Sequence, residues 1–191
     1  LFPYYSDDRI AENNENTGSL TIIRVNGDNG DRIWEPFSSR CAGIYDTTRS
    51  LFKNVLGTSV VFEEVNRDLG LTFRYRWTTS DRFGFVRTSW VGNDSGQQMK
   101  VEILDGFQNI LPFGVMAATQ SRMSNLLDAY KRAELDPETG VAIYSMSSTL
   151  TDLAEPSESL LATRVFHCEL TRPAVLLSGT QVQGFRNGEQ V

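Results

Sequence analysis

The fold class is decided by residues 71–104, which read LTFRYRWTTSDRFGFVRTSWVGNDSGQQMKVEIL. The first seven residues, Leu71 to Trp77, alternate strictly between large apolar or aromatic side chains and Thr or Arg. A period of two places all the apolar side chains on one face of an extended chain. The pattern therefore predicts a half-buried strand of an antiparallel sheet.

The segments around this strand have the same character and are separated by polar turns. Residues 59–65 (SVVFEEV) and 83–91 (FGFVRTSWV) are rich in β-branched and aromatic residues, and 99–104 (MKVEIL) alternates again. The turns NRDLG and GNDSG supply the Gly, Asn and Asp that tight reversals need. We predict that the strands at 71–77, 83–91 and 99–104 follow one another in a meander.

The rest of the chain adds further strands and one longer amphipathic helix. The helix is expected at 120–134 (QSRMSNLLDAYKRAE), where apolar residues recur at spacings of three and four. About nine strands against one helix, without βαβ alternation, predict an antiparallel β-sandwich. We expect an irregular arm over residues 1–18 and the sandwich domain over 19–191. The other strands are expected at 20–25, 141–147, 160–170, 173–177 and 180–185, whereas Pro36 is expected to stop regular pairing in 33–37.

Composition narrows the classes of partner. The 191 residues are 40% hydrophobic and 22% charged, which is typical of a globular chain, and the formal net charge is −6. Nucleic acid is not an expected partner, because a phosphate-binding surface needs clustered Lys and Arg. No apolar run approaches the roughly 20 residues of a membrane span. No glycine-rich phosphate loop occurs, so no nucleotide cofactor is expected.

The sequence shows no set of residues that would form a complete catalytic site. His167 is the one histidine, and Cys41 and Cys168 lack any metal-binding spacing, so we expect neither zinc nor a thiol–imidazole pair. The adjacent Glu63 and Glu64 must face opposite sides of a strand and cannot act together. Asp105 is interpreted as a turn-forming residue at a strand end. We therefore predict no catalytic residue, no metal and no cofactor in this chain.

Aromatic and arginine side chains remain as candidates for binding a neutral polar ligand. Sugar rings stack on flat aromatic faces through their C–H groups, and planar guanidinium groups donate to hydroxyls. Trp77 is expected in the core, because it lies on the apolar stripe. The candidate carbohydrate-binding residues are Trp34, Trp90, Arg74, Arg76 and Arg87.

A family resemblance strengthens the carbohydrate interpretation. Residues 57–115, with FEE leading through LGLTFRYRW to LDGFQNILP, resemble the N-terminal β-sandwich region of large bacterial proteins related to cellobiose phosphorylase. Residues 124–162 (SNLLDAYKRAELDPETGVAIYSMSSTLTDLAEPSESLLA) are similar to the same proteins. The resemblance implies a galactose-mutarotase-like super-sandwich followed by a helical (α/α) barrel that carries the catalytic carboxylate.

What the resemblance implies for function is a non-catalytic domain of a glycoside phosphorylase or hydrolase. The start at Leu1 and the strand-like end at 181–191 lead us to expect a truncated piece of a larger protein. The resemblance implies that this protein is bacterial, and its compartment is then cytoplasmic or periplasmic. The expected partner is the barrel of the same polypeptide, with a carbohydrate ligand and a homodimer as further options. Two alternatives stay open: a free-standing carbohydrate-binding module, and an assembly module without a ligand.

Overall fold

The computed structural model describes residues 15–27, 30–149, 159–171 and 173–190. Within these ranges the chain is mainly β, with ten strands in three antiparallel sheets and three short helices. This confirms the mainly antiparallel fold class. The chain divides into two compact units, one of residues 21–105 and one of residues 1–20 with 106–191. Most of the expected arm at 1–18 lies outside the described residues.

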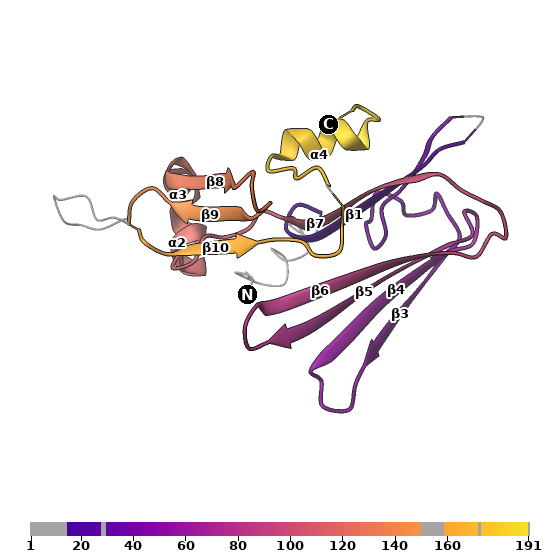
Figure 1. Cartoon of the computed structure of the whole chain (residues 1–191), viewed down its shortest axis with the longest axis horizontal. Helices are drawn as coiled ribbons and strands as arrows, with labels where there is room; N and C mark the ends of the chain where they lie inside the picture. The colour runs from indigo at the N-terminus through magenta and orange to yellow at the C-terminus, as the bar shows by residue number, and fades with distance from the viewer. Residues whose placement is uncertain (1–14, 28–29, 150–158, 172, 191) are drawn as a thin grey trace. The chain divides into compact units, whose positions relative to one another are not determined.

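A four-stranded meander dominates the unit of residues 21–105 (Figure 1). It consists of β3 (Thr47–Lys53), β4 (Ser59–Asn66), β5 (Leu71–Ser80) and β6 (Gly84–Asn93), hydrogen-bonded in that order. The strands predicted at 59–65, 71–77 and 83–91 are confirmed. β3 was not predicted, because most of its side chains are exposed and it therefore lacks an apolar alternation.

A second sheet contains β1 (Gly18–Val25), β2 (Arg32–Trp34) and β7 (Val101–Gln108), in the order β2-β1-β7. The prediction that 99–104 continues the meander is wrong, because this strand leaves β6 and pairs with β1. The Asp105 carboxylate explains part of that choice, since it accepts hydrogen bonds from Thr21 on β1 and Arg87 on β6. Asp105 is thus inside a strand, not at a turn.

The hydrophobic core lies between these two sheets, and the sandwich class fits it. β1 and β2 contribute three of its buried side chains, and Leu69, Leu71 and Phe73 contribute the rest. The alternation of β5 accounts for the arrangement, because its residues at 71, 73, 75 and 77 all point to the inner side of the sheet. The β1 and β2 core residues are Ile23, Val25 and Trp34.

The other unit contains a small sheet of β8 (Lys131–Leu135), β9 (Ala142–Met146) and β10 (Ala162–Val165), in the order β10-β9-β8. Two short helices precede it, α2 (Ala117–Arg122) and α3 (Ser124–Tyr130). The single helix expected at 120–134 is therefore not observed. The chain leaves helical geometry at Met123, and residues 131–135 form five cross-strand pairs with β9. Sheet pairing has overridden local helix propensity there.

The C-terminal part also differs from the prediction. A strand was expected at 180–185, but α4 (Gly179–Arg186) occupies this region. Ser178 and Gln181 form a capping box at its start, with the Ser178 side chain accepting from the Gln181 backbone. The spacing S-x-x-Q is a helix-start signal that the sequence does contain. The described residues of 173–177 form no strand, and the strand expected at 160–170 is reduced to β10.

Among the described residues, no helix has both the length and the apolar character required to cross a membrane.

Candidate functional site

The outward face of the meander brings together three of the five candidate residues. Arg74 on β5 is the cross-strand neighbour of Trp90 on β6, and Arg76 lies diagonally from the same indole. The Arg76 guanidinium carbon is 5.4 Å from the centre of the Trp90 ring. Glu63 on β4 faces Arg74 and forms an ion pair with it. We call Glu63, Arg74, Arg76 and Trp90 the Trp90 face.

The exposure of these side chains suits contact with a ligand. Trp90 is 44% exposed, and the Arg74 side chain is also largely exposed. Arg76 is half-buried, and its Nε atom is buried without a hydrogen-bond partner among the described residues. Glu63 is mostly covered. The face therefore offers a rigid apolar plane flanked by two planar donors.

The other two candidates lie on the inward side. Trp34 is 0% exposed, and its Nε1 donates to a Glu64 carboxylate oxygen at 2.9 Å. A fully buried indole has no free face for a sugar ring, so Trp34 serves the core. The Arg87 side chain is only 4% exposed and donates to Asp105 at 2.7 Å. Arg87 thus holds the two sheets together.

The surroundings of Arg87 form a buried polar cluster. Its second terminal nitrogen donates to the Thr21 hydroxyl at 3.1 Å, and its guanidinium lies 4.6 Å from the centre of the Tyr75 ring. Burial raises the pKa of the Tyr75 phenol, although the positive charge of Arg87 opposes this. Tyr75 therefore remains protonated at neutral pH and does not act as a base.

Glu63 and Glu64 confirm the prediction that adjacent strand residues face opposite ways. Glu63 reaches Arg74 on the outward face, whereas Glu64 is 1% exposed and accepts from Trp34, Phe37 and Arg49 on the inward face. The two carboxylates therefore cannot flank one substrate. Each is committed to a structural partner.

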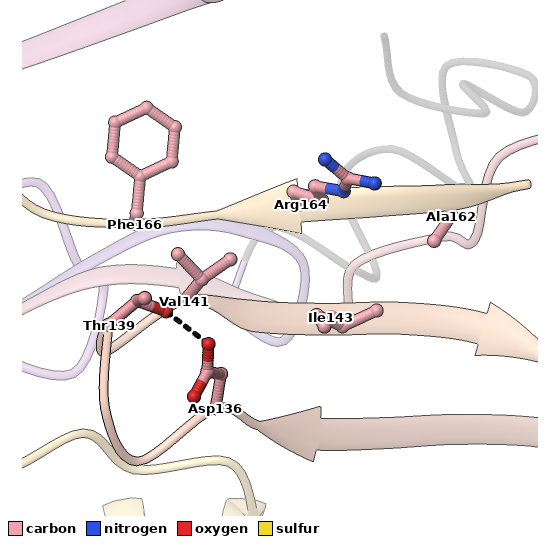
Figure 2. Close-up of a pocket in the computed structure, with 7 residues that line it drawn as sticks. All are labelled: Asp136, Thr139, Val141, Ile143, Ala162, Arg164 and Phe166. Atoms are coloured by element: carbon pink, nitrogen blue, oxygen red, sulfur yellow. Dashed lines mark hydrogen bonds between the residues drawn. The ribbon is translucent and has the colours of Figure 1, made fainter.

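The small sheet of the other unit carries a depression of about 360 Å³ (Figure 2). Its walls are mainly apolar, with Arg164 directly across the strand pair from Ile143. Sequence reasoning did not find this feature, because it depends on which strands pair. The residues that line it are Asp136, Thr139, Val141, Ile143, Ala162, Arg164 and Phe166.

Asp136 is the one carboxylate that lines this depression. Hydrogen bonds from the Thr139 hydroxyl and the Glu138 backbone N–H lower its pKa below the usual range. A carboxyl group that stays ionised at neutral pH cannot donate a proton to a leaving group. The depression therefore lacks the acid and base pair that glycoside cleavage requires.

The cysteines and the histidine show no shared geometry. Neither Cys41 nor Cys168 forms a disulfide; Cys41 is partly buried and accepts a hydrogen bond from the Glu35 backbone N–H, and Cys168 is exposed. His167 is exposed and follows β10, so it lies outside the part of the expected strand at 160–170 that the structure forms. Within the described part of the chain, no group of three or more His, Cys, Asp or Glu could hold a metal ion.

No protein-family model matches this chain, and a search of curated proteins finds no match. Among the described residues, the Trp90 face combines an exposed aromatic ring with neighbouring guanidinium groups. This face can stack a flat apolar ring on the indole and donate hydrogen bonds from two guanidinium groups at its edge.

Proposed function

We propose that this chain is a non-catalytic sandwich domain of a carbohydrate-active enzyme, of the glycoside phosphorylase or hydrolase kind, and that its Trp90 face contacts sugar. The observation that carries the proposal is an exposed Trp90 with Arg74 and Arg76 beside it on one sheet face. The finer fold that we propose is the galactose-mutarotase-like super-sandwich, on the resemblance of residues 57–115.

The chemistry of sugars supports this use of the face. A pyranose has an apolar C–H surface on the flat sides of its ring and hydroxyl groups around its rim. An indole ring stacks on the C–H surface at small conformational cost. Guanidinium N–H groups donate hydrogen bonds to the hydroxyl groups of the rim. Exposed indoles on a sheet lose little entropy on binding, because the strand already fixes their backbone.

The inward side of the meander supports docking onto another domain. Leu51 on β3 and Phe85 on β6 are both more than half exposed, at 62% and 56%. Val55 and Leu56 in the β3–β4 turn are still more exposed. Leu51 and Phe85 lie on the two outer strands of the sheet, and exposed apolar side chains on one sheet face favour burial against another apolar surface. We propose that the helical barrel of the parent polypeptide provides it and performs the catalysis.

The sugar-binding part is tested by calorimetric titration of the whole chain with cellotetraose and maltotetraose. We expect weak but saturable binding, and at least a tenfold loss of affinity in Trp90→Ala, because the stacking plane is removed. Phe83→Ala is the matched control, since Phe83 is an exposed aromatic residue in the β5–β6 turn, away from the face. Equal losses of affinity in the two variants contradict the proposal, as does absence of binding both to these neutral glycans and to glycans whose rings carry a carboxylate.

The barrel part is tested at the level of the gene. We expect the reading frame to continue past Val191 into a predominantly helical region that carries the catalytic carboxylate. A reading frame that closes directly after this residue contradicts the barrel part and leaves a free-standing carbohydrate-binding module as the remaining form of the proposal.

A second candidate function is an assembly module without a ligand, and the exposed apolar residues on the inward side of β3 and β6 favour it. In that case the isolated chain forms a dimer, and Leu51→Asp dissociates it because a charge cannot be buried unpaired in an apolar interface. Sedimentation velocity measures this directly. A monomeric chain at high concentration argues against the assembly function.

A further inference from the structure

We propose that the Trp90 face selects an acidic sugar, a glycan whose rings carry a carboxylate, and that Arg76 is the residue that binds this carboxylate. The inference rests on the proposed function and narrows its ligand class. It follows from a difference between the two arginines of the face: Arg74 has a carboxylate partner, and Arg76 has none among the described residues.

The charge of Arg74 is already compensated, whereas that of Arg76 is not. Arg74 forms an ion pair with Glu63 across the β4–β5 pair. Among the described residues, Arg76 has neither an ion pair nor a hydrogen bond, and its one charged interaction is with the Trp90 ring. The guanidinium groups of Arg74 and Arg76 together with the carboxylate of Glu63 give the Trp90 face one net positive charge.

The position of Arg76 makes this charge hard to satisfy with bulk water alone. The residue is half-buried, and its Nε is shielded from solvent without an acceptor. Buried donors in native proteins are nearly always hydrogen-bonded, so an unpaired one needs an explanation. The buried Nε itself is out of reach of a ligand, but the two terminal nitrogens of Arg76 are not among the shielded atoms and can donate to an acceptor on a bound ligand.

The stacking of Arg76 on Trp90 selects the shape of that acceptor. A guanidinium held against an aromatic ring is restricted in orientation, and its N–H groups form a planar fork that matches the two oxygens of a carboxylate. Because one positive charge is available, a singly charged carboxylate matches the face better than a doubly charged phosphate. The exposed part of the indole remains open to the sugar ring that carries the acid.

The neighbours of Arg76 do not oppose an anion. Across the strands it is paired with Val61 on β4 and Thr88 on β6, which are uncharged. The nearest carboxylate in the register is Glu63, whose charge is offset by Arg74. The acidic character of the whole chain, with a net charge of −6, acts mainly at long range and is screened by salt.

The test compares glycans that differ only in the acid group. One pair is cellotetraose and its counterpart oxidised to the uronate at every C6; the other is tetragalacturonate and its methyl ester. Each is titrated into the whole chain by calorimetry at about 0.15 M salt, where the Debye length of about 8 Å screens the long-range repulsion from the chain's net charge. We expect each acidic form to bind at least about tenfold more tightly than its neutral partner, as a charge-assisted bidentate contact predicts.

The variants assign the preference to Arg76. In Arg76→Gln the acidic and neutral forms should bind equally, and in Arg76→Lys most of the preference should be lost because an ammonium group lacks the planar fork. The matched control is Arg82→Gln, which removes the same charge and a similar contact, 5.2 Å to the Phe83 ring, in the β5–β6 turn. It should keep the full preference.

The outcomes separate the two proposals. Equal binding of acidic and neutral forms by the unmodified chain overturns the acidic-sugar inference and leaves the proposed sugar binding intact. A preference that survives Arg76→Gln assigns the carboxylate to another group and also overturns it. Binding of none of the four glycans overturns the inference and the proposed sugar-binding function together.

Discussion

Replacing Glu64 with Gln should destabilise the unit of residues 21–105 strongly, although the change removes no volume. Three donors converge on this buried carboxylate: Trp34 Nε1 at 2.9 Å, the Phe37 backbone N–H at 2.7 Å and Arg49 Nε at 2.7 Å. The first donor reaches one carboxylate oxygen and the other two reach the second oxygen. A Gln side chain has a single acceptor oxygen, so in either orientation its NH₂ group faces at least one N–H.

The cost can be worked out from these contacts. The least damaging orientation keeps Phe37 and Arg49 and leaves the indole N–H of Trp34 unpaired in the core, at about 1–3 kcal/mol. Loss of the charge weakens the remaining bonds by roughly a further 1 kcal/mol. The ion pair itself is discounted, because the Arg49 side chain is 52% exposed. The expected loss of unfolding free energy is therefore about 2–4 kcal/mol.

Phe37 adds a local reason for this sensitivity. Its φ of 66° is in the left-handed region, which is unfavourable for a bulky residue. The hydrogen bond to Glu64 and the edge contacts of the ring with Phe62 and Tyr75 hold it there. Weakening that bond should release the segment between β2 and β3 as well.

Urea unfolding followed by tryptophan fluorescence measures the effect, since the three tryptophans, at 34, 77 and 90, all lie in this unit. Glu63→Gln is the matched control, because it makes the same change one residue earlier at an outward ion pair with a largely exposed Arg74. We expect less than about 1 kcal/mol for the control. Equal losses in the two variants would refute the reasoning about the buried carboxylate.

Three further predictions follow from single contacts. Gly70 has a φ of +61°, and an added Cβ would lie 2.8 Å from Ser95 Cβ, so Gly70→Ala should cost more than about 2 kcal/mol in urea unfolding. Gly84→Ala is the control, because Gly84 has a φ of +70° with open space around it, and this variant should cost only about 1 kcal/mol. An equal cost for the two variants would show that the contact with Ser95 is not what destabilises Gly70→Ala. Thr139→Val should raise the pKa of Asp136 toward its ordinary value, because the hydroxyl that stabilises the ionised form is lost. The lowered pKa stabilises the fold above the unfolded-state pKa and the effect disappears as the pH falls. Carboxyl NMR titration measures the shift, and Thr139→Ser should preserve the low pKa. Ser178→Ala should destabilise the start of α4 by about 1 kcal/mol, whereas Ser178→Asp should not. Amide hydrogen exchange at the first turn of α4 measures this, and unchanged protection in Ser178→Ala would argue against the capping box.

The sequence by itself determined which residues form the central strands and which way their side chains point. Strict alternation over Leu71 to Trp77 is a local property, because successive side chains on any strand must face opposite sides. It correctly placed Phe73 inward and Arg76 outward, and the same rule, applied to adjacent residues of β4, separated Glu63 from Glu64. Trp90 and Arg76 lie close together because β5 and β6 follow each other in the sequence and pair through a short turn.

Only the tertiary structure decided the pairings between distant segments. β7 joins β1 instead of β6, and Lys131–Leu135 joins β9 instead of extending a helix. These choices depend on partners far away in sequence, such as Thr21 for Asp105, which no local periodicity encodes. The same holds for Trp34, because the carboxylate that receives its indole N–H lies 30 residues away on another strand. Local pattern fixes the period and facing of a strand, whereas the free energy of burial and hydrogen bonding across the sheets selects its neighbour.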